Sequence, residues 1–569
     1  MRGCRVERVP PRRRAACLIL AAGFVAAPAA AQPIPLTPPP PAPPVSAPPG
    51  PAVDSQIQIA PLQPVDISWT GLLDPDHGGF PRDMWNGTGR NVVAELLPQL
   101  QPSASPELDR LAKRLLLSDA TAPAGEIGGA ALLPRRIDRI VAFGLVSDGL
   151  ALIQSLPEAA VTEAIDRDRI ELRFAADDST GACKDIEARV ARYPGVWWAR
   201  ALIACQALAG DFAKASLGQS LLADQKAPPD PEFDALIRLL KERGNGRLAR
   251  LGDPTPLRLA LLAAAKRPLP AEAIAVADPA ALAGYASDTG LPPEDRLAAA
   301  ERAQALGALQ AKSLANLYTA IASKPEELAR ARQAMRPPAD ARDRALLYVL
   351  AKSGDDFAVR MAAIERLAAD AQQHGVFVAR APLLAPALAG IPSADADPKF
   401  AGIAARVLLA AGNGDAAEPW VNAARDKATL LLDRIAQPGV PRLDTGLARD
   451  VAAADGDAAT AQRASLLYAL LTALGVDPSA LDTLAPAALT APVTPGALPN
   501  PALWDMQRQA AGGGRIGATV LATLLIAESD GRLTTEPLML GRAVDGLRSV
   551  GLDGDAHTLA LEAALDGGI

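Results

Sequence analysis

The chain has 569 residues, and its 57 Lys and Arg against 64 Asp and Glu give a net charge of −7 at pH 7. A net negative chain repels nucleic-acid backbones and anionic membrane surfaces, so the charge excludes both as expected partners. Aromatic residues amount to 4%, while alanine and leucine dominate the 49% of hydrophobic residues. Alanine and leucine favour helices, whereas sheets draw on aromatic and β-branched residues, so the composition predicts an all-α protein.

Residues 1–31 have the layout of a secretory signal peptide. Six arginines and one glutamate give this segment a charge of +5, and an apolar stretch at about 15–27 leads to Ala29-Ala30-Ala31. A basic start, a short apolar run and a small-residue site form a cleavable export signal. We expect cleavage after Ala31, which turns the net charge from −7 to −12, and a periplasmic or otherwise exported protein. Ordinary secretion is the default over twin-arginine export, because Ala15-Ala16-Cys17 departs from the twin-arginine pattern.

Two segments with few helix-forming residues follow the signal. Residues 32–55 form a proline-rich leader, and because proline lacks an N–H and fixes φ, we expect a disordered, partly polyproline II spacer. Residues 56–92 are predicted to form a turn-rich N-terminal cap, since Gly, Pro, Asp and Asn cluster there. We expect Trp69 and Trp85 to hold this cap against the first helices.

Residues 93–475 are predicted to form an α-helical repeat domain. Within 340–370, apolar residues recur at helical spacing on both sides of Gly354-Asp355, which is typical of two helices joined by a tight turn. The most apolar later run, at 517–527, ends at Glu528 and is too short to cross a bilayer. We therefore expect no integral membrane segment after signal cleavage.

The dipeptide Gly-Asp recurs between helical stretches. Glycine adopts the left-handed conformation that ends a helix, and aspartate then accepts hydrogen bonds from the free N–H groups of the next helix. The repeated dipeptide thus predicts stacked antiparallel helix pairs, with the Gly252-Asp253 copy leading into Pro254 at the first turn of a helix. The other copies are Gly210-Asp211, Gly354-Asp355, Gly414-Asp415, Gly456-Asp457 and Gly554-Asp555.

Two of these sites resemble the centre of a tetratricopeptide-type repeat. They are "ALIACQALAGDFAKA" at 201–215 and "VAAADGDAATA" at 451–461. In that family a first helix ends near Gly-Asp, and an alanine five residues after the glycine packs the second helix, the position of Ala215 and Ala461. The dipeptides are irregularly spaced, so the resemblance is to the broad class of tetratricopeptide-like α-solenoids. It implies stacked helix hairpins over roughly 95–470 and transfers no functional residues.

The C-terminal part begins with a break in the helical pattern. Frequent prolines make residues 476–502 a predicted proline- and alanine-rich linker or loop. Residues 503–569 supply further helices that we expect to pack on the solenoid. "GGGRIG" at 512–517 matches a dinucleotide-binding pattern, but it follows a helical stretch rather than a strand, so we interpret it as an interhelix turn.

Cys183 and Cys205 lie on either side of Pro194-Gly195, which is predicted to join helices at 182–193 and 196–209. The two cysteines then lie at nearly the same height in an antiparallel hairpin. Exported proteins occupy compartments in which disulfides persist, so we expect a structural disulfide. Two buried free thiols are the alternative, while the absence of a nearby histidine and of a C-x-x-C spacing disfavours zinc or redox chemistry.

The histidines and the Asp-His stretch near the N-terminus give no metal or cofactor prediction. His77, His374 and His557 lie in three distant neighbourhoods and form no H-x-x-x-H pair. Asp74 and Asp76 stand beside His77, but Asp-Pro-Asp-His-Gly-Gly is typical of turns that aspartate caps without an ion. We therefore predict neither a metal site nor a cofactor.

One enzymatic hypothesis rests on "LLIAESDG", which contains Glu528 followed by Ser529. Some periplasmic lytic transglycosylases carry a helical superhelix and a catalytic glutamate followed by serine, and such a carboxyl acts as general acid in an apolar groove. The Gly-Leu-Met-Gln segment of that family is missing here, and only 41 residues follow Glu528. The competing interpretation is that Glu528 ends one helix and "SDGRL" turns into the next.

The sequence therefore predicts an exported, non-enzymatic helical-repeat scaffold or protein-interaction module of the bacterial envelope, with no catalytic residue. Its partner would be a protein or an envelope polymer, bound along stacked helix pairs. The alternatives are a cell-wall-active enzyme or accessory subunit centred on Glu528, and a structural spacer without a specific ligand.

Overall fold

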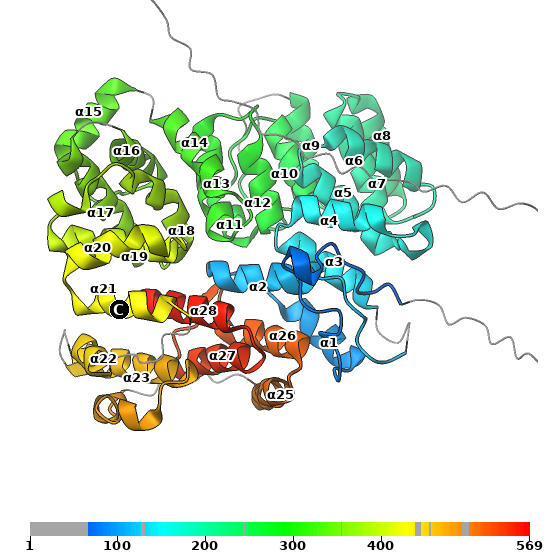
Figure 1. Ribbon diagram of the computed structural model, residues 1–569. Coiled ribbons are helices and arrows are strands. Elements are labelled where there is room, and N and C mark those ends of the chain that lie inside the picture. Colours follow the sequence, from blue (N-terminus) through cyan, green and yellow to red (C-terminus); the bar gives the residue numbers. More distant parts are fainter. Residues whose placement is uncertain are drawn as a thin grey trace, which may run out of the picture. The chain divides into compact units, whose positions relative to one another are not determined.

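The computed structural model describes residues 66–126, 131–242, 246, 248–322, 324–353, 356–438, 445–453, 457–491 and 500–569. These residues form helices and one small hairpin, so the predicted all-α class is confirmed (Figure 1). The signal peptide, the leader and the start of the cap lie outside the described residues, as do residues 492–499 of the predicted linker. Across the described ranges, no helix is long and apolar enough to cross a membrane.

The helices of the first part are α1 (Arg90–Leu96), α2 (Pro106–Leu117), α3 (Leu132–Ala142), α4 (Val146–Ser155), α5 (Glu163–Ala175), α6 (Ser179–Arg189), α7 (Val196–Leu208), α8 (Phe212–Asp224) and α9 (Pro231–Glu242). The middle part contains α10 (Pro256–Ala264), α11 (Ala271–Val276), α12 (Pro279–Ser287), α13 (Pro293–Ala305), α14 (Ala311–Ile321), α15 (Pro325–Ala334), α16 (Ala341–Lys352), α17 (Phe357–Gln373), α18 (Phe377–Leu384), α19 (Pro398–Ala410) and α20 (Gly414–Ala424).

The last part contains α21 (Lys427–Ala436), α22 (Thr445–Ala452), α23 (Asp457–Ala473), α24 (Ala485–Ala488), α25 (Pro501–Gly512), α26 (Ile516–Ala527), α27 (Pro537–Ser549) and α28 (Asp553–Asp566). Strands β1 (Glu528–Ser529) and β2 (Arg532–Leu533) pair antiparallel. Short 3-10 turns are η1 (Pro75–His77), η2 (Leu97–Gln99), η3 (Glu158–Ala160), η4 (Ala385–Leu388), η5 (Ser393–Asp395) and η7 (Pro478–Leu481).

Many helices begin with a capping side chain followed by proline. Ser105, Thr255 and Asp397 precede Pro106, Pro256 and Pro398, and each side-chain oxygen accepts a hydrogen bond from the N–H three residues later. Proline suits the first helical position because its missing N–H would have no partner there. Helix α10 therefore begins at Pro256 behind the Thr255 cap, and the expected start at Pro254 is wrong by two residues.

The Gly-Asp interpretation holds at one described site. Gly210 has φ +79°, and the Asp211 carboxylate accepts a hydrogen bond from the Lys214 N–H over 3.1 Å at the start of α8. Residues 354, 355 and 456 lie outside the described part, so those two copies stay predictions.

At two other sites the dipeptide lies inside a helix. Gly412 and Gly551, with φ +74° and +80°, already provide the left-handed turn, so α20 begins at Gly414 and α28 at Asp553. The expected turn at Gly554-Asp555 is wrong because a glycine three residues earlier satisfies the same backbone requirement.

Neighbouring helices pack closely because the side chains between them are small. A Cβ atom on Gly218 of α8 would lie 2.7 Å from Cγ1 of Ile203 on α7, so glycine permits this close approach. Ala215 is the buried residue of α8. Gln219, also on α8, donates to Asp234 of α9 over 2.7 Å. Gly218 is a weak helix former, but its missing side chain lets α7 and α8 pack closely.

Packing also joins residues far apart in the sequence. Helix α28 contacts α2, α19 and α21, and it lies beside α21 in Figure 1. Helix α26 contacts α2, and the Gly517 N–H donates to the Met84 carbonyl over 2.9 Å. A Cβ atom on Gly517 would lie 2.8 Å from Trp85, so this glycine lets the C-terminal helices approach the N-terminal turns.

A set of charged and polar groups, which we call the α2–α28 clasp, fixes this long-range contact. It consists of Ser105, Arg110 and Arg114 from α2 and its cap, with Asp555 and Glu562 from α28. Arg114 donates to Asp555 over 2.7 Å, Arg110 donates to the same carboxylate, and the Ser105 hydroxyl donates to Glu562. Asp555 and Glu562 lie seven residues apart, which places them on one face of α28.

Glu562 acts as a second cap for α2. Its carboxylate accepts a hydrogen bond from the Glu107 N–H over 3.0 Å, in addition to the bond from Ser105. Only 3% of Glu562 is exposed, and burial raises the pKa of its carboxyl from 4.5 to about 8. The nearby acidic groups Asp109 and Asp566 add to this rise in the Glu562 pKa. A buried carboxyl thus binds a proton in the folded state that the unfolded chain releases.

The sign of the resulting pH dependence follows from proton binding. Between about 4.5 and 8 the folded state holds more protons at Glu562 than the unfolded state, so this group lowers the free energy of unfolding as pH rises. Glu562→Gln keeps an oxygen acceptor for Ser105 but does not ionise. We expect the variant to gain stability relative to wild type with rising pH, by up to about 1.4 kcal/mol per pH unit, in urea unfolding.

Glu95→Gln, at an exposed position of α1, is the matched control and should follow the wild-type pH dependence. Identical slopes for Glu562→Gln and wild type would contradict the assignment of a folded-state proton to Glu562.

Candidate functional site

The two predicted site cysteines lie on adjacent helices at disulfide-bonding distance. Cys183 on α6 and Cys205 on α7 have Sγ atoms 2.01 Å apart and Cα atoms 5.5 Å apart. Helix α6 runs earlier than expected, from Ser179 to Arg189, while α7 begins at Val196 as expected. The predicted equal height in the hairpin therefore agrees with these positions, and the pair ties α6 to α7.

The adjacent tryptophans of α7 have different environments. Trp198 is fully buried, stacks on Tyr193 with ring centroids 5.0 Å apart, and donates from Nε1 to Glu163 over 2.9 Å. Trp197 is half-buried, and the Arg167 guanidinium lies 4.7 Å from its ring centroid. Adjacent positions of a helix point about 100° apart, so one ring enters the core and the other reaches a neighbouring helix.

Glu528 lies where α26 ends and the β1–β2 hairpin begins. Its Oε1 atom accepts a hydrogen bond from the Gly531 N–H over 2.7 Å. Burial raises the pKa of this half-buried carboxyl. Asp530 and Gly531 both have positive φ, so the Glu528 carboxylate holds a tight turn. The hydrogen bond of Glu528 thus has a structural role: it stabilises the turn between β1 and β2.

Asp74, Asp76 and His77 belong to a capped turn. Asp74 is the N-cap of η1 and accepts a hydrogen bond from the His77 N–H over 2.9 Å. His374 and His557 lie elsewhere and contact the backbone carbonyls of Asp370 and Ile435. The structure, where it describes the chain, brings together no group of three or more His, Cys, Asp or Glu able to hold a metal ion.

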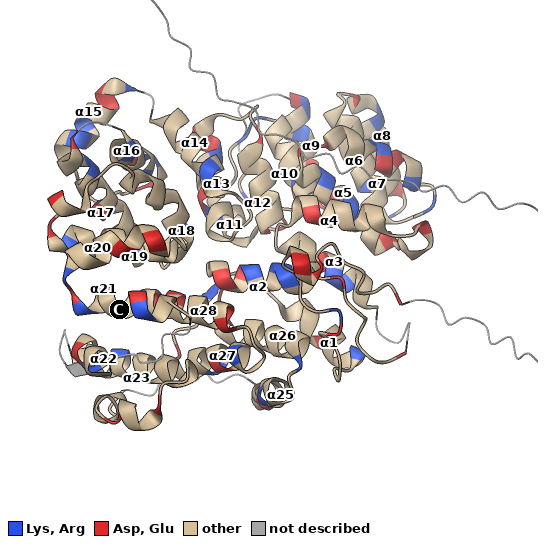
Figure 2. Ribbon diagram, in the orientation of Figure 1, with Lys and Arg blue, Asp and Glu red and all other residues tan. Residues whose placement is uncertain are grey.

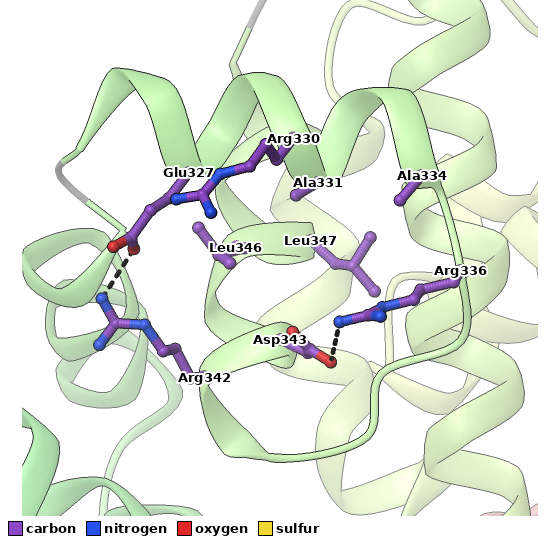
Figure 3. A pocket seen from close by; sticks show the side chains of 9 residues that line it. All are labelled: Glu327, Arg330, Ala331, Ala334, Arg336, Arg342, Asp343, Leu346 and Leu347. Carbon is purple, nitrogen blue, oxygen red and sulfur yellow. Dashed lines mark hydrogen bonds and ion pairs between the residues drawn. The ribbon is translucent and has the colours of Figure 1, made fainter.

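The clearest candidate for a binding site is a groove between α15 and α16. Its cavity volume is about 440 Å³. Figure 3 shows Leu346 and Leu347 of α16 at the centre of the groove. Arg330, Arg336 and Arg342 surround them. The remaining lining residues are Glu327, Ala331, Ala334 and Asp343. We call this cavity the α15 groove.

Helix α15 is held by partly buried apolar residues, among them Leu328 and Ala331, and by polar contacts. None of its residues is fully buried. Arg332 pairs with Asp356 over 2.7 Å, and Arg366 donates to the Met335 carbonyl over 3.2 Å. Met335 ends the helix with φ +37°, an uncommon conformation for a residue with a side chain. We expect a helix without a fully buried residue to open locally at lower free energy than the core.

The charges of the groove are incompletely balanced. Arg342 donates to Glu327 over 2.7 Å, and this hydrogen bond lowers the Glu327 pKa. Arg336 lies 3.7 Å from Asp343, and its side chain is 72% exposed. Arg330 donates to the Glu326 carbonyl and forms no ion pair with any carboxylate of the described residues. Arg330 therefore remains available to an anionic group, and Arg336 is exposed beside its ion-pair partner Asp343.

No motif or helical pattern in the sequence indicates this groove. Residues 324–344 contain six basic and four acidic side chains, and Figure 2 shows both signs on α15. The high density of charged residues is visible in the sequence. Helical spacing alone, however, does not predict that every residue of α15 is at least partly exposed.

No family model matches the chain, and neither the curated proteins nor the solved structures contain a match to it. The tetratricopeptide-like resemblance therefore stays a prediction.

The cysteine pair has a measurable effect on stability. A crosslink over a sequence separation of 22 restricts the unfolded chain, so Cys183→Ser/Cys205→Ser should lose about 3 kcal/mol of unfolding free energy. Reductant should lower wild-type stability to that of the double variant in urea unfolding and leave the variant unchanged. Two titratable thiols in the denatured, unreduced mature protein would contradict the bond.

Proposed function

We propose that the protein is an exported, non-enzymatic helical scaffold whose α15 groove binds an acidic, partly apolar segment of a partner protein. The observation that carries the proposal is the combination of an apolar floor with Arg330, which has no carboxylate partner among the described residues, and the exposed Arg336. A proline-rich leader after an export signal, and a cysteine pair at bonding distance, suit a protein of an oxidising compartment outside the cytoplasm.

The arginines favour carboxylates as the recognised groups. A guanidinium presents its donors in a planar fork that matches the two oxygens of a carboxylate. Arg330 lies within α15 and Arg336 follows its C-cap Met335, and both line the groove. A ligand with two acidic side chains would therefore satisfy both arginines at once.

The floor favours a peptide over a uniformly charged polymer. Leu346 and Leu347 are 8% and 3% exposed, and Ala331 and Ala334 cover them from α15. Burying an apolar side chain against such a floor contributes roughly 25 cal/mol per Å² of area removed from water. A polyanion without apolar groups would leave this surface unused, whereas a segment that mixes leucine and glutamate would cover it.

The proposal predicts binding of a labelled test peptide containing Leu-Glu-Glu-Leu between Gly-Ser flanks, measured by fluorescence anisotropy at low salt. Arg330→Glu/Arg336→Glu should weaken binding at least about tenfold, because the arginine–carboxylate attraction becomes repulsion. Raising the salt concentration should weaken wild-type binding in the same direction.

Arg82→Glu/Arg508→Glu is the matched control, since both arginines are exposed and lie outside the groove. It should bind the peptide as wild type does. Equal losses in the two double variants, or equal binding of a peptide with lysine in place of glutamate, would contradict recognition by the groove.

The non-enzymatic part of the proposal has its own test at Glu528. Its carboxylate is engaged by the Gly531 N–H, so we expect wild type and Glu528→Gln to give no clearing on peptidoglycan zymograms. Clearing by wild type that disappears in Glu528→Gln would favour the cell-wall enzyme instead. A protein that binds neither the test peptide nor any envelope polymer would fit a structural spacer.

A further inference from the structure

A second cavity, of about 230 Å³, lies among α5, α7, α9 and the start of α10. Helix α10 contacts α5, α7 and α9, and the four helices lie together in Figure 1. Trp197 and Phe233 contribute aromatic rings to its wall, and Glu171, Arg200 and Arg258 contribute charged groups. We call it the Trp197 cavity. It is separate in sequence from the α15 groove and independent of the function proposed there.

Carboxylates outnumber guanidinium groups around this cavity. Asp230 pairs with Arg258 over 2.6 Å and lies 3.6 Å from Arg200. Arg258 also lies 3.6 Å from Glu232 and 3.5 Å from Asp253. With Glu171, and with Arg167 whose charge also acts on Glu171, four carboxylates lie near three arginines. The excess of negative charge favours a cation as the missing partner.

Glu171 has one oxygen available to such a cation. Its Oε2 atom accepts a hydrogen bond from the Leu257 N–H over 2.9 Å in the first turn of α10. Its Oε1 atom has no hydrogen-bond donor among the residues that the structure describes. Burial raises the pKa of this carboxyl to about 7, and a bound cation would favour its ionised form.

The aromatic wall adds a second mode of cation binding. The faces of aromatic rings attract ammonium and guanidinium groups, most strongly in tryptophan. Arg167 already stacks on Trp197, with its guanidinium 4.7 Å from the ring centroid, although it does not line the cavity. Trp197 is half-buried, so its ring remains in reach of a ligand.

We propose that the Trp197 cavity binds an organic ammonium group, held between Glu171, Asp253 and the aromatic wall of Trp197 and Phe233. The volume suits a small alkylammonium, either as a free amine or as a lysine side chain of a partner. The ammonium would contact the open Glu171 oxygen, while its alkyl substituents pack against the rings. Arg200 and Arg258 remain paired with Asp230 and stay in place.

The test compares choline with 3,3-dimethylbutan-1-ol, which has the same shape without the charge, by titration calorimetry and saturation-transfer NMR on the full chain. We expect choline to bind at least about tenfold more tightly than the alcohol. A second probe, acetyl-Gly-Lys-Gly-amide, distinguishes the sources: tighter binding of this peptide than of choline indicates a lysine side chain, and the reverse indicates a free amine. Failure of both cations to bind overturns the proposal.

Three variants locate the binding. Glu171→Gln, which keeps an oxygen for the Leu257 N–H, and Trp197→Leu should each weaken binding at least about fivefold. Trp504→Leu, which removes a tryptophan beside Arg542 on another part of the chain, should bind as wild type does. Circular dichroism checks that each variant is folded. Equal binding of choline and the alcohol, or unchanged binding in folded Glu171→Gln and Trp197→Leu, overturns the proposal.

Discussion

The contact of Glu562 and Asp555 with α2 is the interaction on which the remaining arrangement depends. It joins groups more than 440 positions apart in the sequence. Asp555 is largely buried and pairs with two arginines that are partly exposed, so removing these arginines would leave its carboxylate without a charge partner. Alanine and leucine side chains pack in many registers, whereas Arg114 reaches Asp555 in only one. Polar contacts, among them the charged Arg114–Asp555 pair, therefore fix the position of α28 within an otherwise uniform set of helices.

Helix α15 departs from this pattern. Its ion pairs are exposed, and exposed pairs contribute about 0–1 kcal/mol each. The helix covers Leu346 and Leu347 without burying any of its own residues completely. The binding of a partner proposed above depends on this helix and its arginines.

The sequence predicts features whose causes lie within a few residues or within one helical hairpin. The Gly210-Asp211 turn and the position of Cys183 opposite Cys205 follow from backbone rules and hairpin geometry. The role of Asp555 was not predictable, because its partners Arg110 and Arg114 lie far away in sequence and no pattern near residue 555 indicates them. Likewise, the carboxylate excess around Arg258 comes from several separate segments. Helical spacing predicts which residues share a face, but not which face meets a distant helix.

Amide hydrogen exchange followed by mass spectrometry tests the account most directly, since it compares α15 with the clasp in one molecule. We expect the amides of α15 to exchange by local opening, and those of α28 to exchange only when the whole protein unfolds. Adding the Leu-Glu-Glu-Leu peptide should slow exchange in α15 and leave α28 unchanged. Equal protection of the α15 and α28 amides from exchange, with no change on adding the peptide, would contradict both the loose packing of α15 and its role in binding.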